Sequence, residues 1–243
     1  MSTTKAQAFR KKRTYKKYPK KRTYAKKSTG YKKYNNAAAM TVMSYPMPQK
    51  CSTQLTISFS DGLISALTSS HALVYRPTSY FDVDPVVGGG SYAGYAFFAG
   101  MYSRYRVTGF AYEVTFTNLQ AQSVMVGCQG IPSVTTPNVG TATDYTEMAA
   151  ENEFGTSTIL APTSATPTRT LKGYINTTRL WGTPEVKTDN DWAGAVGASP
   201  AANSWLRISA HMLNNAAMTI GVQFHVKIKA YGYWDQKNPD LIG

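Results

Sequence analysis

The stretch YRVTGFAYEVTFTN, residues 105–118, shows the clearest pattern in this chain. Along most of it apolar and polar residues alternate, and the apolar set is Phe110, Tyr112, Val114 and Phe116. A period of two is that of a β-strand that buries one face. β-branched and aromatic residues, which strands favour, also fill much of the stretch. It predicts a long, half-buried strand and therefore a protein built on sheets.

Similar alternation recurs on both sides of this strand. A second long strand is expected over 219–234, where one face would carry Ile220, Val222, Phe224, Val226, Ile228 and Ala230. Shorter strands are expected over 51–60, 71–76, 122–130, 156–160, 170–180 and 204–213. The segment 122–130 would be the hairpin partner of 105–118, and Asp61-Gly62 would end the first strand.

Helices are expected to be few and short. Residues 144–153 have the composition of one short helix, 95–105 contain a helical turn, and 131–140 and 181–203 are expected to be loops. About eight strands that do not alternate with helices leave a sandwich or a barrel. We expect an all-β sandwich of two four-stranded sheets.

The first 33 residues differ sharply from the rest. They hold fourteen of the 26 Lys and Arg residues and no acid, whereas residues 34–243 hold 12 bases against 13 acids. So highly charged a segment, with so few aliphatic side chains, cannot bury enough apolar surface to offset the entropy cost of ordering it. We therefore expect a disordered basic arm and connector over 1–45 and one sandwich domain over 46–243.

Tyrosines are interleaved with the basic residues of this arm. Lys and Arg neutralise phosphates with release of counterions, and tyrosine rings stack on unpaired bases, so the pattern favours single-stranded nucleic acid. The residues expected to bind it are Arg10, Lys11, Lys12, Arg13, Tyr15, Lys16, Lys17, Tyr18, Lys20, Lys21, Arg22, Tyr24, Lys26, Lys27, Lys32 and Lys33. A nuclear import signal would use Arg10, Lys11, Lys12, Arg13, Lys20, Lys21 and Arg22. A solubilising tail is the plainer alternative.

Two further basic residues stand out in the body. Lys227 and Lys229 alternate with Val226 and Ile228 in the last expected strand, so both lysines would lie on its polar face. They would either extend the positive surface of the arm, as basic residues of an inner surface, or be ordinary solvated charges. The pattern leaves both interpretations open.

Nothing in the sequence favours an enzyme. The chain lacks a Gly-x-Ser-x-Gly elbow, a His-Glu-x-x-His helix and a Walker loop. The three histidines stand apart from one another at His71, His211 and His225. We expect no catalytic residues and no cofactor.

Metal, disulfide and membrane roles are not expected either. The acidic pairs, Asp82 with Asp84 and Asp189 with Asp191, belong to no 12-residue calcium loop. The two cysteines do not make a disulfide framework or a Cys-x-x-Cys zinc site. No apolar run reaches the ~18 residues of a membrane span. The sparse charge of the body instead fits a surface that is covered by neighbouring subunits.

A basic, tyrosine-rich arm followed by eight strands resembles the coat proteins of small icosahedral viruses. The residues that carry the resemblance are Met101–Gly109 running into Glu113–Asn118, Leu171–Tyr174 with Leu180–Gly182, and Tyr231–Trp234. These stretches are most similar to capsid proteins of circovirus-like, Rep-encoding circular single-stranded DNA viruses. The layout covers the whole chain, while the single motifs are degenerate, so the match is to a class.

The resemblance implies a single eight-stranded jelly roll that assembles with itself into a T=1 icosahedral shell of about 60 copies. It implies packaging of circular single-stranded DNA by the arm, a place in the virion, and passage through the host nucleus with the help of import receptors. The coat protein of a small single-stranded RNA virus and a non-viral single-strand-binding module remain as alternatives. Because ten of the fourteen basic residues of this arm are lysine, which binds phosphate as a point charge, sequence-specific packaging is not expected.

Overall fold

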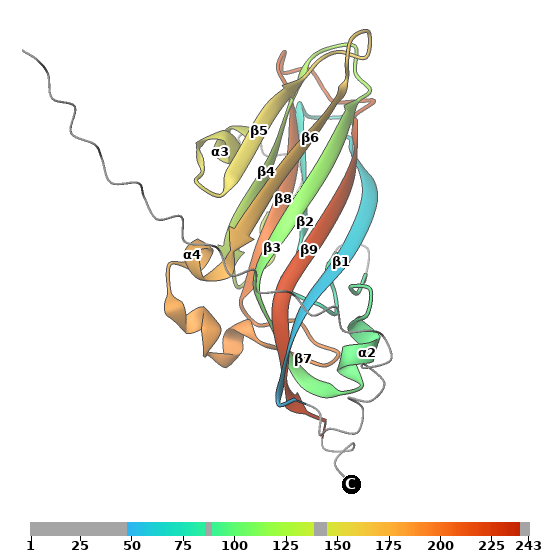
Figure 1. Cartoon of the computed structure of the whole chain (residues 1–243). Helices are drawn as coiled ribbons and strands as arrows, with labels where there is room; N and C mark the ends of the chain where they lie inside the picture. The colour runs from blue at the N-terminus through green and yellow to red at the C-terminus, as the bar shows by residue number, and fades with distance from the viewer. Residues whose placement is uncertain (1–47, 86–88, 139–144, 239–243) are drawn as a thin grey trace, which may run out of the picture. The chain divides into compact units, whose positions relative to one another are not determined.

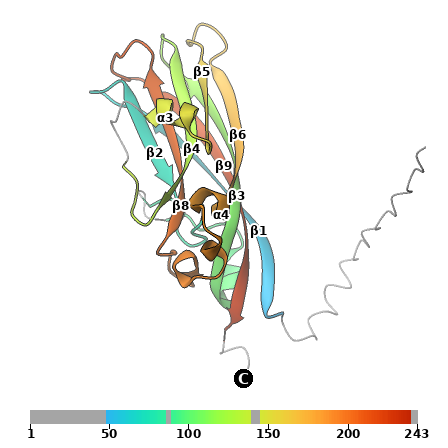
Figure 2. The ribbon, with the colours of Figure 1, turned by 90° about the vertical axis from the view of Figure 1, so that its left-hand side faces the viewer.

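Eight long strands form two antiparallel sheets that pack face to face (Figures 1 and 2). The structure is a computed structural model that describes residues 48–85, 89–138 and 145–238. The first sheet has the order β1-β9-β3-β6 and the second the order β2-β8-β4-β5. The predicted all-β sandwich of two sheets is therefore confirmed, with four main strands in each sheet and a two-residue fifth strand added to the first.

The strand bounds follow the alternating pattern of the sequence. The first sheet comprises β1 (Lys50–Leu63), β9 (Val222–Lys237), β3 (Tyr102–Asn118) and β6 (Thr168–Asn176). The second comprises β2 (Ser70–Tyr75), β8 (Asn203–Met212), β4 (Val124–Ser133) and β5 (Gly155–Leu160). A two-residue strand, β7 (Gly194–Ala195), pairs with the start of β3.

The strand order is that of a jelly roll. Of the described strands the first pairs with the last, and the chain changes sheet at each connection except those from β4 to β5 and from β6 to β7. β9 lies between β1 and β3 and is paired with both along nearly its whole length. This long central pairing fixes which side chains share a face, because directly opposed residues point to the same side of a sheet.

Short helices fill the connections. They are α2 (Tyr95–Ala99), α3 (Tyr145–Glu151), α4 (Thr177–Trp181), and the 3-10 turns η2 (Pro184–Lys187) and η3 (Asn190–Trp192). α3 packs on the outer face of the second sheet over Gly127, where a Cβ would lie 2.8 Å from the Cβ of Ala149. The short helix expected over 144–153 and the helical turn expected within 95–105 are thus confirmed. Among the described helices none is long and apolar enough to cross a membrane.

The core lies between the sheets and is built from every second residue of each strand. Phe110, Val114 and Phe116 of β3 are fully buried or nearly so, as are Val226 and Ile228 of β9. Towards the β7 end of the first sheet the core becomes aromatic, with rings from loops and strands in contact: Tyr80, Tyr92, Tyr95, Phe98, Tyr105 and Trp234. These rings attach the connections around residues 77–100 to the sheet.

The predicted hairpin between 105–118 and 122–130 is wrong. β4 pairs with β5 and β8 in the second sheet, while β3 pairs with β9 and β6 in the first. The chain instead crosses between the sheets after β3, and the Asn118 side chain stabilises this crossing. Its amide donates to the carbonyls of Gln122 and Ala161, both at 2.8 Å, and its Oδ1 accepts from the backbone N–H of Gln120.

Several expected bounds also change. β1 continues through Asp61-Gly62 because the opposing β9 continues with it, and β4 runs on to Ser133. The strand expected over 170–180 ends at Asn176, where α4 begins. Ile220 precedes β9 and is exposed instead of sharing its buried face. The region 181–203, expected to be one loop, contains η2, η3 and β7.

The disordered arm and the boundary between residues 45 and 46 fall outside the described residues. Both stay predictions.

Candidate nucleic-acid interface

The sixteen arm residues predicted to bind nucleic acid, and the seven assigned to nuclear import, lie outside the described residues. The candidate interface on the body therefore starts from Lys227 and Lys229. Both lie on the outer face of β9, while the intervening Ile228 points into the core. Two residues along a strand correspond to about 6.8 Å, so each ammonium group has a separate place on this face.

A row of charged residues crosses three strands at Lys227. Lys227 lies directly opposite Glu113 of β3, and Glu113 lies opposite Lys172 of β6. The Lys172 Nζ is 2.8 Å from the Glu113 Oε1. That hydrogen bond and charge, with a smaller effect from Lys227, lower the pKa of Glu113 below its usual range. Because the pair is well exposed, we assign it little stability, but it holds Lys172 in place on the face.

The neighbouring row brings an aromatic ring to the same face. Lys229 lies opposite Ala111, and Ala111 lies opposite Tyr174 of β6. The Tyr174 ring extends over Gly109, where a Cβ would lie only 2.5 Å from the Tyr174 hydroxyl. Glycine at 109 therefore makes room for this ring, which remains 58% exposed.

Tyr231 of β9 completes an aromatic pair with Tyr174. Their ring centroids are 5.9 Å apart and their planes are inclined at 67°, an edge-to-face contact. Both tyrosines occur in stretches that carry the resemblance described above, but they were not predicted as binding residues. Their alternation with Lys172 and with Lys229 was the available signal, since side chains two positions apart share a face.

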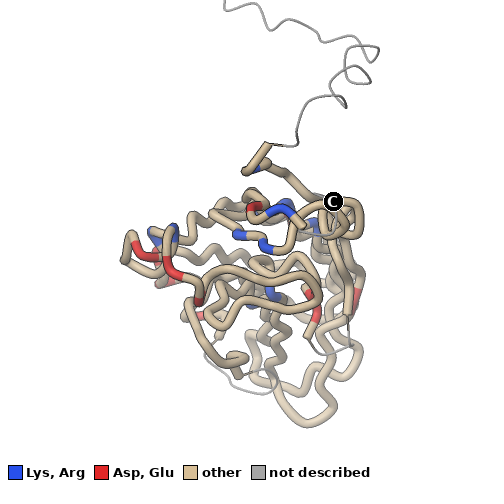
Figure 3. Tube along the Cα trace, turned by 90° about the horizontal axis from the view of Figure 1, so that it is seen from below, with Lys and Arg blue, Asp and Glu red and all other residues tan. Residues whose placement is uncertain are grey.

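A hollow of about 390 Å³ lies beside this pair: Tyr231 lines it, whereas Tyr174 borders it through its contact with Tyr231. Ala111 helps to keep it open because it brings only a methyl group to it, and Glu113 also lines it. Around it stand Lys172, Lys227, Lys229 and Tyr231. The outer face thus combines three lysines, one carboxylate and two partly exposed aromatic rings. Figure 3 views the body from below, and most of its blue Lys and Arg segments lie in the upper half of the picture.

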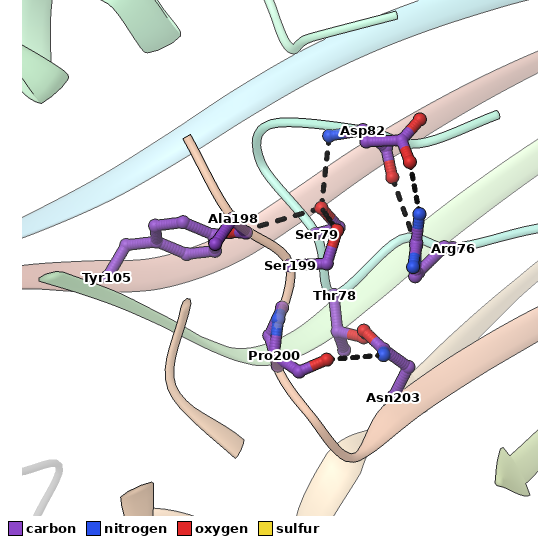
Figure 4. Close-up of polar contacts among 9 residues, drawn as sticks. All are labelled: Arg76, Thr78, Ser79, Asp82, Tyr105, Ala198, Ser199, Pro200 and Asn203. Atoms are coloured by element: carbon purple, nitrogen blue, oxygen red, sulfur yellow. Dashed lines mark hydrogen bonds and ion pairs between the residues drawn. The ribbon is translucent and has the colours of Figure 1, made fainter. Parts of the chain in front are cut away.

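The predicted acidic pairs have structural contacts. Asp82 forms an ion pair with Arg76, and its backbone N–H donates to the Ser79 Oγ at 3.0 Å (Figure 4). The same Oγ is 2.9 Å from the Oγ of Ser199, which joins two connections far apart in sequence. Asp189 accepts a hydrogen bond from the backbone N–H of Asp191 and begins η3. Among the described residues no three His, Cys, Asp or Glu side chains are placed to hold a metal ion.

The histidines occupy separate positions. His225 lies on the outer face of β9, and its Nδ1 is 2.9 Å from the Ser60 Oγ on the neighbouring β1. Asp61, next to this pair in sequence, instead accepts from the backbone N–H of Gly62 at 2.7 Å. His71 and His211 lie on strands of the second sheet. The Ser60–His225 contact is therefore a cross-strand pair on the outer face of the first sheet.

Comparison with known proteins gives distant structural likenesses. No protein-family model matches the chain. No curated protein matches it either. The structure is similar to the BFDV capsid protein, crystallised as a decamer, with 11% identity, coverage of 77% of this chain and 99% of that chain, and a TM-score of 0.43.

Two virus particles have similar sequence identities, coverages and TM-scores. A semi-empty particle of the Macrobrachium rosenbergii nodavirus has 12% identity, coverage of 81% of this chain and 89% of that chain, and a TM-score of 0.41. Tobacco necrosis virus has 8% identity, coverage of 82% and 91%, and a TM-score of 0.41. Because all three TM-scores lie below 0.5, we assign the jelly roll from the strand order of this chain and take no function from these proteins.

Proposed function

We propose that this chain is a viral capsid protein, with a structural and not a catalytic role. In this proposal it assembles with itself into a small icosahedral T=1 shell of about 60 copies and packages circular single-stranded DNA. The observation that carries the proposal is the placement of charge. A basic arm precedes β1 in the sequence, and β1 belongs to the sheet whose outer face bears Lys172, Lys227 and Lys229.

This placement supports an orientation in the shell. The outer face of the first sheet would line the interior, so that Lys227 and Lys229 act together with the arms on the packaged nucleic acid. About 60 arms would supply about 840 positive charges, which is on the order of the phosphate charge of a genome of one to two kilobases. The connections 77–95, 131–143 and 182–203 would form contacts between subunits or the outer surface.

Assembly would start with the arms. Each arm binds single-stranded nucleic acid by charge and stacking, and subunits held on one strand reach a high local concentration. The sparsely charged surfaces of the bodies then pack against one another. The basic groups Arg10–Arg13 and Lys20–Arg22 would also bind import receptors, which would bring the protein to the host nucleus before assembly.

Electron microscopy of the purified full-length protein tests the shell directly. We expect uniform particles of about 20 nm, the size that roughly 60 bodies of this mass would form. Digestion of opened particles with DNase and RNase separately identifies the cargo, and we expect DNA. Cargo removed only by RNase would favour the coat protein of an RNA virus. Small oligomers alone, at every salt and protein concentration, would favour a non-viral single-strand-binding module.

Deletion of residues 1–33 tests the arm. The remaining body keeps every described strand, so we expect it to fold and to form shells or smaller oligomers with far less nucleic acid. The ratio of absorbance at 260 and 280 nm of purified particles measures the cargo. A matched control replaces every lysine of the arm by arginine, which keeps the charge and should keep packaging. Equal cargo in the truncated and full-length particles would contradict the role of the arm.

A further inference from the structure

We propose that the hollow beside Tyr174 is a nucleotide subsite that holds one base and its neighbouring phosphates of a single strand. The base would stack on one ring of the Tyr174–Tyr231 pair and contact the edge of the other, and the phosphates would lie near Lys227 and Lys229. The inference rests on the proposed function, since it places packaged nucleic acid on this face. It assigns the body a contact with the bases in addition to the contact made by the arm.

The exposed Tyr174 ring, in contact with the half-buried Tyr231, is the first feature that supports a subsite. Tyr80, Tyr92 and Tyr105 are buried, and their hydroxyls are hydrogen-bonded. Tyr174 instead leaves more than half of its surface open on a polar sheet face. An open ring beside lysines is the arrangement with which proteins stack unpaired bases and hold the strand by its phosphates.

Charge is the second argument. Glu113 offsets one lysine of the face by its pair with Lys172. In the described parts of the chain, Lys227 and Lys229 form no ion pair. The face therefore keeps two positive charges that its own carboxylate does not neutralise, and they lie beside the hollow. A strand with one negative charge per phosphate complements this excess.

Space for a base is also present beside the aromatic pair. Gly109 allows the Tyr174 ring to extend over β3, and Ala111 brings only a methyl group to the position between Lys229 and Tyr174. The resulting hollow of about 390 Å³ is near the lower end of the range for small-ligand pockets. It suits a single nucleotide and is too small for a folded partner. An acidic peptide would satisfy the lysines but would leave the aromatic pair without a role.

Photo-cross-linking locates the bound strand. The full-length protein is mixed with single-stranded DNA or RNA oligonucleotides that carry 5-iodouracil, irradiated, and mapped by mass spectrometry. We expect cross-links to Tyr174 or Tyr231 in addition to the arm tyrosines. The DNA and RNA forms show whether the site distinguishes the two sugars.

Affinity of the same full-length protein tests the stacking. Tyr174→Ala should weaken binding of a short oligonucleotide by about fivefold or more. Ala111→Leu fills the hollow without a change of charge and should also weaken binding. The matched control is Phe97→Ala, which removes a 63% exposed ring from α2 and should leave affinity unchanged. Circular dichroism of each variant checks that the fold is kept.

Salt dependence tests the lysines. The double variant Lys227→Ala and Lys229→Ala should lose two phosphate contacts. The slope of log affinity against log salt should then become less steep by about 1.4. The control pair Lys187→Ala and Lys237→Ala removes the same charge elsewhere and should change the slope less.

The outcomes separate this inference from the proposed function. Cross-links confined to the arm, with unchanged affinity of Tyr174→Ala, overturn the subsite and leave the capsid proposal intact. Sensitivity to the lysine changes without any effect of Tyr174→Ala or Ala111→Leu also overturns it, in favour of a contact by charge alone. Failure of the full-length protein to bind any single strand overturns both.

Discussion

Tyr105 illustrates how single residues hold one end of the sandwich together. Its ring stacks on Tyr80 with centroids 5.0 Å apart and contacts Trp234 at 5.2 Å. Its hydroxyl donates to the carbonyl of Ala198 at 2.8 Å, so one side chain joins β3 to two connections. Burial disfavours the phenolate and raises the pKa of Tyr105 to about 12.

This burial predicts a loss of stability at high pH. In the unfolded chain tyrosine ionises near pH 10, whereas Tyr105 and Tyr112 in the fold ionise near 12. Below pH 10 both states keep the proton and the effect is absent. Between about pH 10 and 12 only the unfolded state loses it, so the free energy of unfolding should fall by up to about 1.4 kcal/mol per pH unit for each such tyrosine.

Urea unfolding followed by tryptophan fluorescence at pH 9 to 11.5 checks this expectation. Tyr105→Phe is the matched variant, because it keeps the ring but has no proton to lose. Its stability should be lower at neutral pH, by about 1 kcal/mol for the lost hydrogen bond, and should depend less steeply on pH. An unfolding midpoint that stays level up to pH 11.5 would contradict the argument.

At the scale of elements, the junction of β6 and α4 depends on a cap. The Asn176 side chain accepts from the backbone N–H of Arg179 at 3.1 Å, and Gly182 ends the helix with a φ of 69°. We expect Asn176→Ala to lower the free energy of unfolding by about 1 kcal/mol, because a helix N–H loses its partner. Urea unfolding measures the loss. Asn176→Asp, which keeps an acceptor, should lose much less; equal losses would show that the cap is not responsible.

The strands were largely predictable from the sequence, but their partners were not. Alternation is a local property, and it located β1, β3, β8 and β9 within a few residues. Pairing is decided by the crossing of the chain between sheets, which at β3 depends on the hydrogen bonds of Asn118. The end of β6 was missed because an Asn that caps a helix also looks acceptable at a strand end.

The candidate site shows the same division. Alternation along one strand was enough to place Lys227 and Lys229 together on the outer face. Their neighbours Tyr174 and Glu113 come from other strands, and only the register of three paired strands brings them to the same rows. The hollow beside Ala111 likewise depends on the residues opposite it in the two neighbouring strands, Tyr174 and Lys229.

At the scale of the whole body, the four connections at one end of the sandwich have no charged side chains. The connections 64–69, 119–123, 161–167 and 213–221 contain no Lys, Arg, Asp or Glu. Backbone hydrogen bonds hold them together, as between Ser65 and Met218 at 3.0 Å. Apolar side chains remain exposed there, and Leu67 is 91% exposed. Such an end fits a contact between subunits, where charged residues are depleted.

Leu67→Asp tests this end. Because the side chain is exposed, we expect the fold and its urea stability to change by less than about 0.5 kcal/mol, while shell formation is lost. Size-exclusion chromatography and electron microscopy measure assembly. Leu67→Ala, which shortens the side chain without a charge, should still assemble. Normal shells from Leu67→Asp would place the subunit contact elsewhere.

The pairing of β1 with β9 has a consequence for synthesis of the chain. In the register of this pair Lys50 lies opposite Asp235. In its sheet β1 therefore has no hydrogen-bonded neighbour until β9 has left the ribosome. Closing so long a loop is slow and leaves the nascent strands open to wrong partners. The basic arm precedes β1 in the sequence, so it leaves the ribosome while the body is still unfinished. Completion of the first sheet therefore depends on the synthesis of β9.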